Sequence, residues 1–223
     1  MVPFGWRFMG TLFGVLMLPL FYIIGKMLFK KRFYAGIMTA LFAADFMHFA
    51  QTRIATIDSY SVFFILLMFL FMLWYTKTNY NRQPLKETLL PLFLCGISFG
   101  LGAATKWLCI YSGAGLAIIF IGIQIKRKFE YDRLLQGGEK VCSYKSNLIK
   151  TILWCVLFFI IIPLCIYFAS YTPYTTVTQG SAYTFSDVIE NQKYMLNYHE
   201  YLVVDHPHPF ASEWYTWIFD IRP

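Results

Sequence analysis

The chain has 223 residues, of which 58% are hydrophobic and 14% charged, and its formal net charge is +7. Several uncharged runs approach the roughly 20 residues that cross about 30 Å of hydrocarbon, which excludes an ordinary globular domain. The basic residues form short clusters between apolar runs, without the aromatic-interleaved pattern of an RNA or DNA binder, so we expect no nucleic-acid partner. The composition predicts an all-α polytopic membrane protein.

About six apolar segments are predicted to be transmembrane helices. They cover approximately residues 6–25, 34–50, 59–76, 88–104, 109–125 and 149–170. Only the short stretch ATKWL separates the fourth segment from the fifth, which predicts a tight helical pair. Residues 126–148 are predicted to form a cytoplasmic loop that has room for a short surface helix broken at Gly137-Gly138.

The positive charges predict the orientation in the membrane. Fourteen of the 19 basic residues lie in the segments 26–32, 77–86 and 126–150, which are alternate connections. By the positive-inside rule these connections are cytoplasmic, so residues 171–223 are expected to form an extracytoplasmic loop of a multi-pass cell-membrane protein. An outer N-terminus without a leader and an abrupt end at Asp-Ile-Arg-Pro predict an internal portion of a larger protein, with upstream and downstream parts missing.

Four charged residues are predicted to lie at the outer ends of four different spans: Arg7, Arg53, Asp58 and Lys106. A charge at bilayer depth is costly, by about 2.5 to 3.5 kcal/mol or more. Lysine and arginine bind phosphate through charge-assisted hydrogen bonds, so the four together could form a recessed site for an anionic lipid headgroup. The alternative is that each side chain reaches independently for the interface. We favour the shared site.

Two local pairings are also expected at this end. Arg53 is expected to face a lipid headgroup or to pair with Asp58, five residues further on. For Asp58 we expect this pairing together with capping of the third span, where a carboxylate satisfies exposed amides and favours the helix dipole. Asp45 and His48 lie one turn apart near the end of the second span and are expected to hydrogen-bond each other or a neighbouring helix.

The stretch DHPHPFASEWYTW is dense in histidine and aromatic residues. Its His-Pro-His sequence could hold a metal, but prolines keep that segment extended and no third ligand has a recognisable spacing, so we expect neither a metal nor another cofactor. Trp214 and Trp217 fit an aromatic belt at the membrane interface. They fit equally well a platform on which a sugar ring stacks, and both interpretations stay open.

Four sequence blocks, in this order, resemble the protein O-mannosyltransferase family, which consists of GT-C-type glycosyltransferases. In that family an arginine opens a span, and SRI-x-x-(L/I)-D, (S/T)-K-W and H-x-(Y/F)-x-S-x-W-x-x-W blocks follow. The corresponding stretches here contain GWRFMG, TRIATID, TKW and HPFASEWYTW. The resemblance covers nearly the whole chain, and the bacterial branch fits best because no large extracytoplasmic domain separates the blocks.

The resemblance implies transfer of mannose from polyprenyl-phosphate-mannose to Ser or Thr hydroxyls of secreted proteins at the extracytoplasmic membrane face. By position it implies that the donor phosphate is bound by Arg7, Arg53 and Lys106, with Asp58 and Thr105 in support. In the outer loop it implies sugar or acceptor contacts by His208, Ser212, Trp214 and Trp217. The family's catalytic Asp-Glu pair has no counterpart in this chain and is expected upstream of Met1.

Two other functions stay open. Related lipid-linked-sugar transferases, including aminoarabinose transferases, share the first blocks more loosely. A membrane transporter would place polar residues repeatedly in mid-span, facing a pathway. The spans here are nearly bare of mid-span charge, and their polar groups gather at one face.

Overall fold

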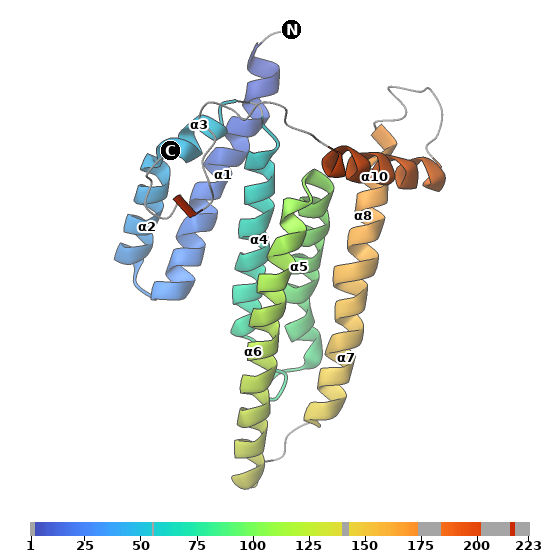
Figure 1. Ribbon diagram of the computed structural model, residues 1–223. Helices are drawn as coiled ribbons and strands as arrows, with labels where there is room; N and C mark the ends of the chain where they lie inside the picture. Colours follow the sequence, from blue (N-terminus) through green and yellow to red (C-terminus); the bar gives the residue numbers. More distant parts are fainter. Residues whose placement is uncertain (1–2, 55, 140–142, 174–183, 202–214, 217–223) are drawn as a thin grey trace. The chain divides into compact units, whose positions relative to one another are not determined.

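The computed structural model describes residues 3–54, 56–139, 143–173, 184–201 and 215–216 (Figure 1). Within these ranges the regular structure is helical, in agreement with the all-α prediction. The chain divides into two compact units, Met1–Ser170 and Tyr171–Pro223, and each is described by itself.

The first unit contains the apolar helices. They are α1 (Pro3–Phe29), α2 (Arg32–Ala44), α3 (Phe46–Gln51), α4 (Asp58–Thr76), α5 (Leu85–Thr105), α6 (Leu108–Gln136), and a rod made of α7 (Tyr144–Val156), the π-helical turn η1 (Leu157–Ile161) and α8 (Ile162–Ser170). Among the described residues, five segments are long and apolar enough to cross a membrane: Arg7–Phe29, Asp58–Thr76, Leu85–Thr105, Leu108–Gln136 and Tyr144–Ser170. The described residues therefore belong to a multi-pass membrane protein.

The second predicted span, 34–50, is corrected by the structure, because it is two helices instead of one. Asp45 has an extended backbone (φ −66°, ψ 120°), so α2 ends at Ala44 and α3 begins at Phe46. The Asp45 carboxylate accepts a hydrogen bond of 2.8 Å from the His48 backbone N–H. This bond confirms the expected contact in the form of a helix N-cap. With 13 residues, α2 is about 20 Å long and too short to cross the hydrocarbon alone.

Helix α6 runs to Gln136, so the first part of the predicted loop 126–148 is helical. The helix ends at the predicted glycine pair. Gly138 has φ +77°, its N–H donates to the Leu135 carbonyl at 3.0 Å, and the Glu139 N–H donates to the Leu134 carbonyl at 3.1 Å. This is a Schellman-type ending, which needs a residue that tolerates a left-handed conformation.

The connections of the first unit alternate between its two ends (Figure 1). The turn at 30–31, the turn at 77–84 and the end of α6 lie at one end. The end of α3, the start of α4 and the junction at 106–107 lie at the other. The three basic segments therefore gather at a single end. The charged residues of the candidate phosphate site lie at the opposite end.

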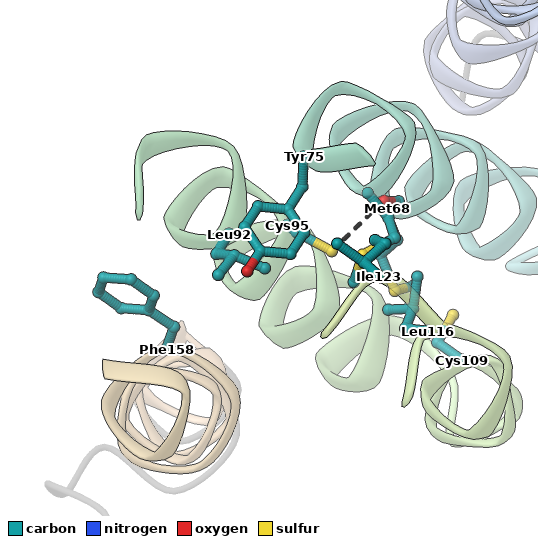
Figure 2. Packing of buried hydrophobic residues seen from close by; sticks show 9 residues of the cluster. Met68, Tyr75, Leu92, Cys95, Cys109, Leu116, Ile123 and Phe158 are labelled. Carbon is teal, nitrogen blue, oxygen red and sulfur yellow. Dashed lines mark hydrogen bonds between the residues drawn. The ribbon is translucent and has the colours of Figure 1, made fainter. Parts of the chain in front are cut away.

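The core of the first unit lies among α4, α5, α6 and η1 (Figure 2). It is formed by Met68, Met72, Tyr75, Leu92, Cys95, Cys109, Leu116, Ile123 and Phe158. The Cys95 thiol donates to the Met68 carbonyl at 3.3 Å. A Cβ atom on Gly96 would lie 2.3 Å from the Phe158 carbonyl oxygen, so only glycine allows this approach of α5 to η1. Helices α4, α5 and α6 thus share a close-packed base for the residues at their ends.

The second unit contains α10 (Phe185–Glu200), a helix that lies inside the predicted outer loop. It begins with a capping box, in which the Asp187 carboxylate accepts from the Thr184 backbone N–H at 2.8 Å. The motif residues His208, Ser212, Trp214 and Trp217 lie outside the described residues, and their roles stay predictions.

Candidate functional site

Lys106 lies on the junction between α5 and α6, which consists of Lys106 and Trp107 alone. The Lys106 backbone is extended (φ −157°, ψ 134°), and its N–H donates to the Gly102 carbonyl at 2.9 Å. Its carbonyl accepts from the Cys109 N–H at 3.0 Å. Since hydrogen bonds on both sides tie this short junction to the two helices, the base of the Lys106 side chain has a fixed position.

Helix α4 supports the same junction from the side. The buried Cys109 thiol donates to the Ser61 carbonyl of α4 at 3.6 Å. A Cβ atom on Gly102 would lie 3.1 Å from Cys109 Sγ and 3.2 Å from Phe64 Cβ. The three helices α4, α5 and α6 therefore meet closely beside Lys106, which places its side chain next to the start of α4.

The Lys106 ammonium forms an ion pair with the Asp58 carboxylate, with 2.5 Å between Nζ and Oδ1. The two side chains are 39% and 45% exposed, so a ligand can reach both. The expected pairing of Asp58 with Arg53 is therefore wrong, because packing of α4 against the α5–α6 junction brings in Lys106 from 48 residues away. The expected capping is also corrected: Asp58 is the first residue of α4 and Ile57 takes the cap position. A carboxylate in the first turn still favours the helix dipole.

Arg53 follows α3 and is exposed, with its guanidinium carbon 4.4 Å from the centroid of the Phe49 ring. The preceding residue, Thr52, is buried against α1, because a Cβ atom on Gly14 would lie only 2.6 Å from its Cγ2. The Ser59 hydroxyl donates to the Gln51 carbonyl at 3.0 Å and ties the same turn to α4. The turn that carries Arg53 is thus anchored to two helices.

Arg7 lies near the start of α1, with an exposed side chain and a carbonyl that accepts from the Thr11 hydroxyl at 3.1 Å. The Thr105 hydroxyl donates to the Leu101 carbonyl of its own helix at 2.9 Å, so it stabilises the end of α5. The structure joins Asp58 to Lys106. Arg7 belongs to the first turns of α1 and Arg53 follows α3, and the start of α1 and the end of α3 lie at the same end of the unit as the α5–α6 junction (Figure 1).

This end of the first unit carries the cations Arg7, Arg53 and Lys106 and the carboxylate of Asp58, and it also carries Asp45, whose carboxylate caps α3. A half-exposed ammonium with two guanidinium groups at the same end suits an anion such as phosphate. In the ranges that the structure covers, no three His, Cys, Asp or Glu side chains are grouped so that they could hold a metal ion.

Sequence reasoning missed a second polar cluster, at the opposite end of α6. Arg127, which the sequence assigns to a loop, is 2% exposed and donates to the Tyr75 hydroxyl at 2.5 Å. Gln124 lies one turn earlier and also donates to the Tyr75 hydroxyl, at 2.8 Å. The available signal was the spacing of Gln124 and Arg127, which puts both on one face of a helix that continues past residue 125.

Comparison with known proteins yields one family and a small set of relatives. The family model for dolichyl-phosphate-mannose-protein mannosyltransferase matches residues 1–177. A polyprenol-phosphate-mannose–protein mannosyltransferase of Mycobacterium tuberculosis is 22% identical over 258 residues, covering 99% of this chain and 47% of the relative. One of Mycolicibacterium smegmatis is 23% identical over 192 residues, covering 76% of this chain and 34% of the relative. The chain thus spans about half the length or less of these curated relatives, and no solved structure matches it.

Proposed function

The chain belongs to the dolichyl-phosphate-mannose-protein mannosyltransferase family, and we propose that it takes part in moving mannose from a polyprenyl-phosphate carrier to Ser or Thr hydroxyls of proteins. The names of the relatives support a polyprenol-phosphate-mannose donor and a protein acceptor. The hydroxyl acceptors follow from the motif resemblance. The distribution of basic residues supports an extracytoplasmic site in a cell membrane.

The observation that carries this proposal is the ion pair between Lys106 and Asp58 at the junction of α4, α5 and α6. Lys106 is held in place by its backbone and by Asp58, yet its ammonium is half-exposed and has further donor hydrogens. In the proposed complex a phosphate oxygen of the donor accepts from Lys106. Arg53, and Arg7 from α1, add positive charge at the same end of the unit.

This arrangement suits the chemistry of the transfer. The bond between mannose C1 and the phosphate oxygen breaks, and a bond forms between C1 and the acceptor hydroxyl oxygen. A carboxylate takes the hydroxyl proton, and the family resemblance implies inversion at C1. The departing phosphate gains negative charge, which the Lys106 ammonium stabilises most strongly in the transition state. The proton-accepting carboxylate is not assigned to a residue of this chain.

The outer-loop motif is proposed to position the sugar or the acceptor. Its indole rings, Trp214 and Trp217, would stack on the mannose ring, while His208 supplies a hydrogen bond. On this proposal His208→Ala and Trp214→Ala lower transfer, whereas Tyr183→Ala in the preceding linker changes it little. Full activity of both motif variants would reduce the loop to a membrane anchor.

The test of the proposed function is transfer of mannose to a Ser/Thr peptide by Lys106→Ala and Lys106→Arg in the membrane-inserted protein. Loss of a charge that acts in the transition state lowers the rate about a hundredfold or more, and arginine restores part of it. Lys126→Ala, an exposed cation at the opposite end of α6, is the matched control and keeps normal activity. Normal transfer by Lys106→Ala, at normal protein levels, would remove the assigned role.

A further inference from the structure

The turn between α1 and α2 carries four basic residues in seven positions: Lys26, Lys30, Lys31 and Arg32. All four side chains are exposed. The first acidic residue of the chain is Asp45, at the far end of α2. None of the three ion pairs found among the described residues involves the turn. The turn is therefore a concentrated positive charge that the neighbouring helices α1 and α2 do not neutralise.

An apolar groove of about 650 Å³ runs between α1 and α2 beside this turn. It is lined by Phe21, Phe29, Tyr34, Ile37, Met38, Leu41 and Phe42. Near the turn the Phe29 and Tyr34 rings meet edge to face, with 6.3 Å between centroids. At the far end Phe21 and Phe42 stack at 4.1 Å. Tyr34 and Phe42 are eight residues apart on α2, so the groove is about 12 Å long.

Lys31 connects the charge to the groove. Its Nζ lies 5.8 Å from the centroid of the Tyr34 ring, which lines the groove. The walls are fixed relative to each other, because a Cβ atom on Gly25 of α1 would lie 3.1 Å from Ala35 Cα of α2. A cluster of cations thus lies at the mouth of an open apolar groove between two helices whose spacing is fixed.

We propose that this turn and groove bind an anionic glycerophospholipid. Its phosphate accepts hydrogen bonds from Lys30, Lys31 and Arg32, and one acyl chain fills the groove between α1 and α2. Charge complementarity favours this occupant, because a zwitterionic headgroup brings its own cation to a turn that already has four. The site lies at the opposite end of the first unit from Lys106 (Figure 1), so it is distinct from the proposed donor site.

The experiment places a photo-crosslinking amino acid at Ile37, in the groove, in protein reconstituted with equal amounts of phosphatidylglycerol and phosphatidylcholine. The control position is Ile118, an exposed residue of α6 that lies eight residues, about 12 Å along the helix, before the nearest basic residue of that helix, Lys126. Adducts are counted by mass spectrometry. At Ile37 phosphatidylglycerol adducts exceed phosphatidylcholine adducts at least fivefold, because each nearby cation favours anionic lipid by about that factor. At Ile118 the two lipids react in equal amounts.

A variant with Lys30→Gln, Lys31→Gln and Arg32→Gln loses the preference at Ile37. If that variant does not fold, salt provides the second measurement. Raising the salt concentration from about 0.05 to about 0.5 M lowers the preference for phosphatidylglycerol at Ile37 in protein that keeps the basic turn, since exposed charges are screened. The proposal would be overturned if the ratio of phosphatidylglycerol to phosphatidylcholine adducts were the same at Ile37 and Ile118. It would also be overturned if the preference for phosphatidylglycerol at Ile37 persisted both in the triple variant and at high salt. Adducts at Ile37 with protein instead of lipid would also overturn it, because a polypeptide would then cover the groove.

Discussion

Lys106 lies just before α6 and Arg127 lies 21 residues further on, in the second half of that helix, and the protein holds these two cations in opposite ways. Lys106 is half-exposed and contacts a carboxylate, Asp58, which is itself half-exposed. Arg127 is 2% exposed, and its hydrogen bonds to described residues go to neutral groups, including the Tyr75 hydroxyl at 2.5 Å and the Thr78 carbonyl at 2.8 Å. The first arrangement leaves the cation able to bind an anion, whereas the second uses the cation to hold the fold together.

The surroundings of Arg127 explain why it tolerates burial without a carboxylate. Its guanidinium lies 4.2 and 4.6 Å from the centroids of the Tyr75 and Tyr80 rings. The Tyr80 hydroxyl donates to Gln124 at 2.8 Å, and the Asn81 amide donates to the Arg127 carbonyl at 2.9 Å. Burial raises the pKa of Tyr80, so its hydroxyl remains a neutral donor. The network fastens the connection between α4 and α5 to α6.

Removal of the buried cation is expected to have the largest effect on stability. Arg127→Ala removes one of the two donors to the Tyr75 hydroxyl and the guanidinium that donates to the Thr78 carbonyl, and we expect the free energy of unfolding to fall by about 3 kcal/mol. Denaturant unfolding in lipid nanodiscs measures it. The matched control is Arg133→Ala, an exposed arginine two turns further along α6, with a change within about 0.5 kcal/mol. Equal effects of the two variants would contradict the structural role of Arg127.

Asp58→Asn tests the other half of the comparison, the exposed ion pair between Lys106 and Asp58. A half-exposed ion pair contributes about 0–1 kcal/mol, so stability changes little. Transfer falls about tenfold or more, because the Lys106 ammonium loses the group that positions it. Unfolding and mannose transfer, measured on the same preparation, separate the two effects. If Asp58→Asn lost as much stability as Arg127→Ala, or if its transfer were unchanged, the Asp58–Lys106 pair would not have the functional role that distinguishes it from Arg127.

Asp187 is expected to show the smallest effect, since it is only partly buried and its carboxylate serves the capping box at the start of a single helix, α10. Hydrogen bonds from the Thr184 hydroxyl and backbone N–H hold the pKa of Asp187 below its usual value. The folded-state pKa is therefore lower than the unfolded one of about 3.9, so the stabilisation is present above that pH and is lost as the pH falls through the lowered pKa.

Hydrogen exchange of the first turn of α10 measures this contribution. Asp187→Asn should speed exchange at pH 7, whereas variant and parent should converge once acid has protonated Asp187. A pH-independent difference would mean that the substitution acts through something other than the carboxylate charge.

Much of the fold could be predicted from hydropathy and charge, because these act over whole segments. The long spans and the gathering of basic turns at one end are examples, and the glycine pair after α6 marked the end of that helix. The break at Asp45 could not be obtained in this way. There a single side chain caps α3, and this local bond ends α2 inside an apolar run.

The candidate site was predictable as a set of residues but not as a set of contacts. The motifs singled out Lys106 and Asp58, yet their ion pair joins residues 48 positions apart and depends on how α4 packs against α5 and α6. Arg53, the nearer cation, lies on Phe49 instead. Arg127 was missed for a similar reason, because its burial depends on Tyr75 and Tyr80 from another helix and its following turn.

The central claim is that Lys106 binds the phosphate of the lipid donor, and binding of polyprenyl phosphate without the sugar tests it most directly. Equilibrium binding is compared for the unchanged protein, Lys106→Ala and Lys126→Ala in nanodiscs of uncharged lipid. A charge-assisted hydrogen bond contributes about 1.5–3 kcal/mol, so Lys106→Ala is expected to weaken binding at least tenfold, with Lys126→Ala unchanged. Equal affinity of all three proteins would contradict the assignment of Lys106 as the phosphate ligand.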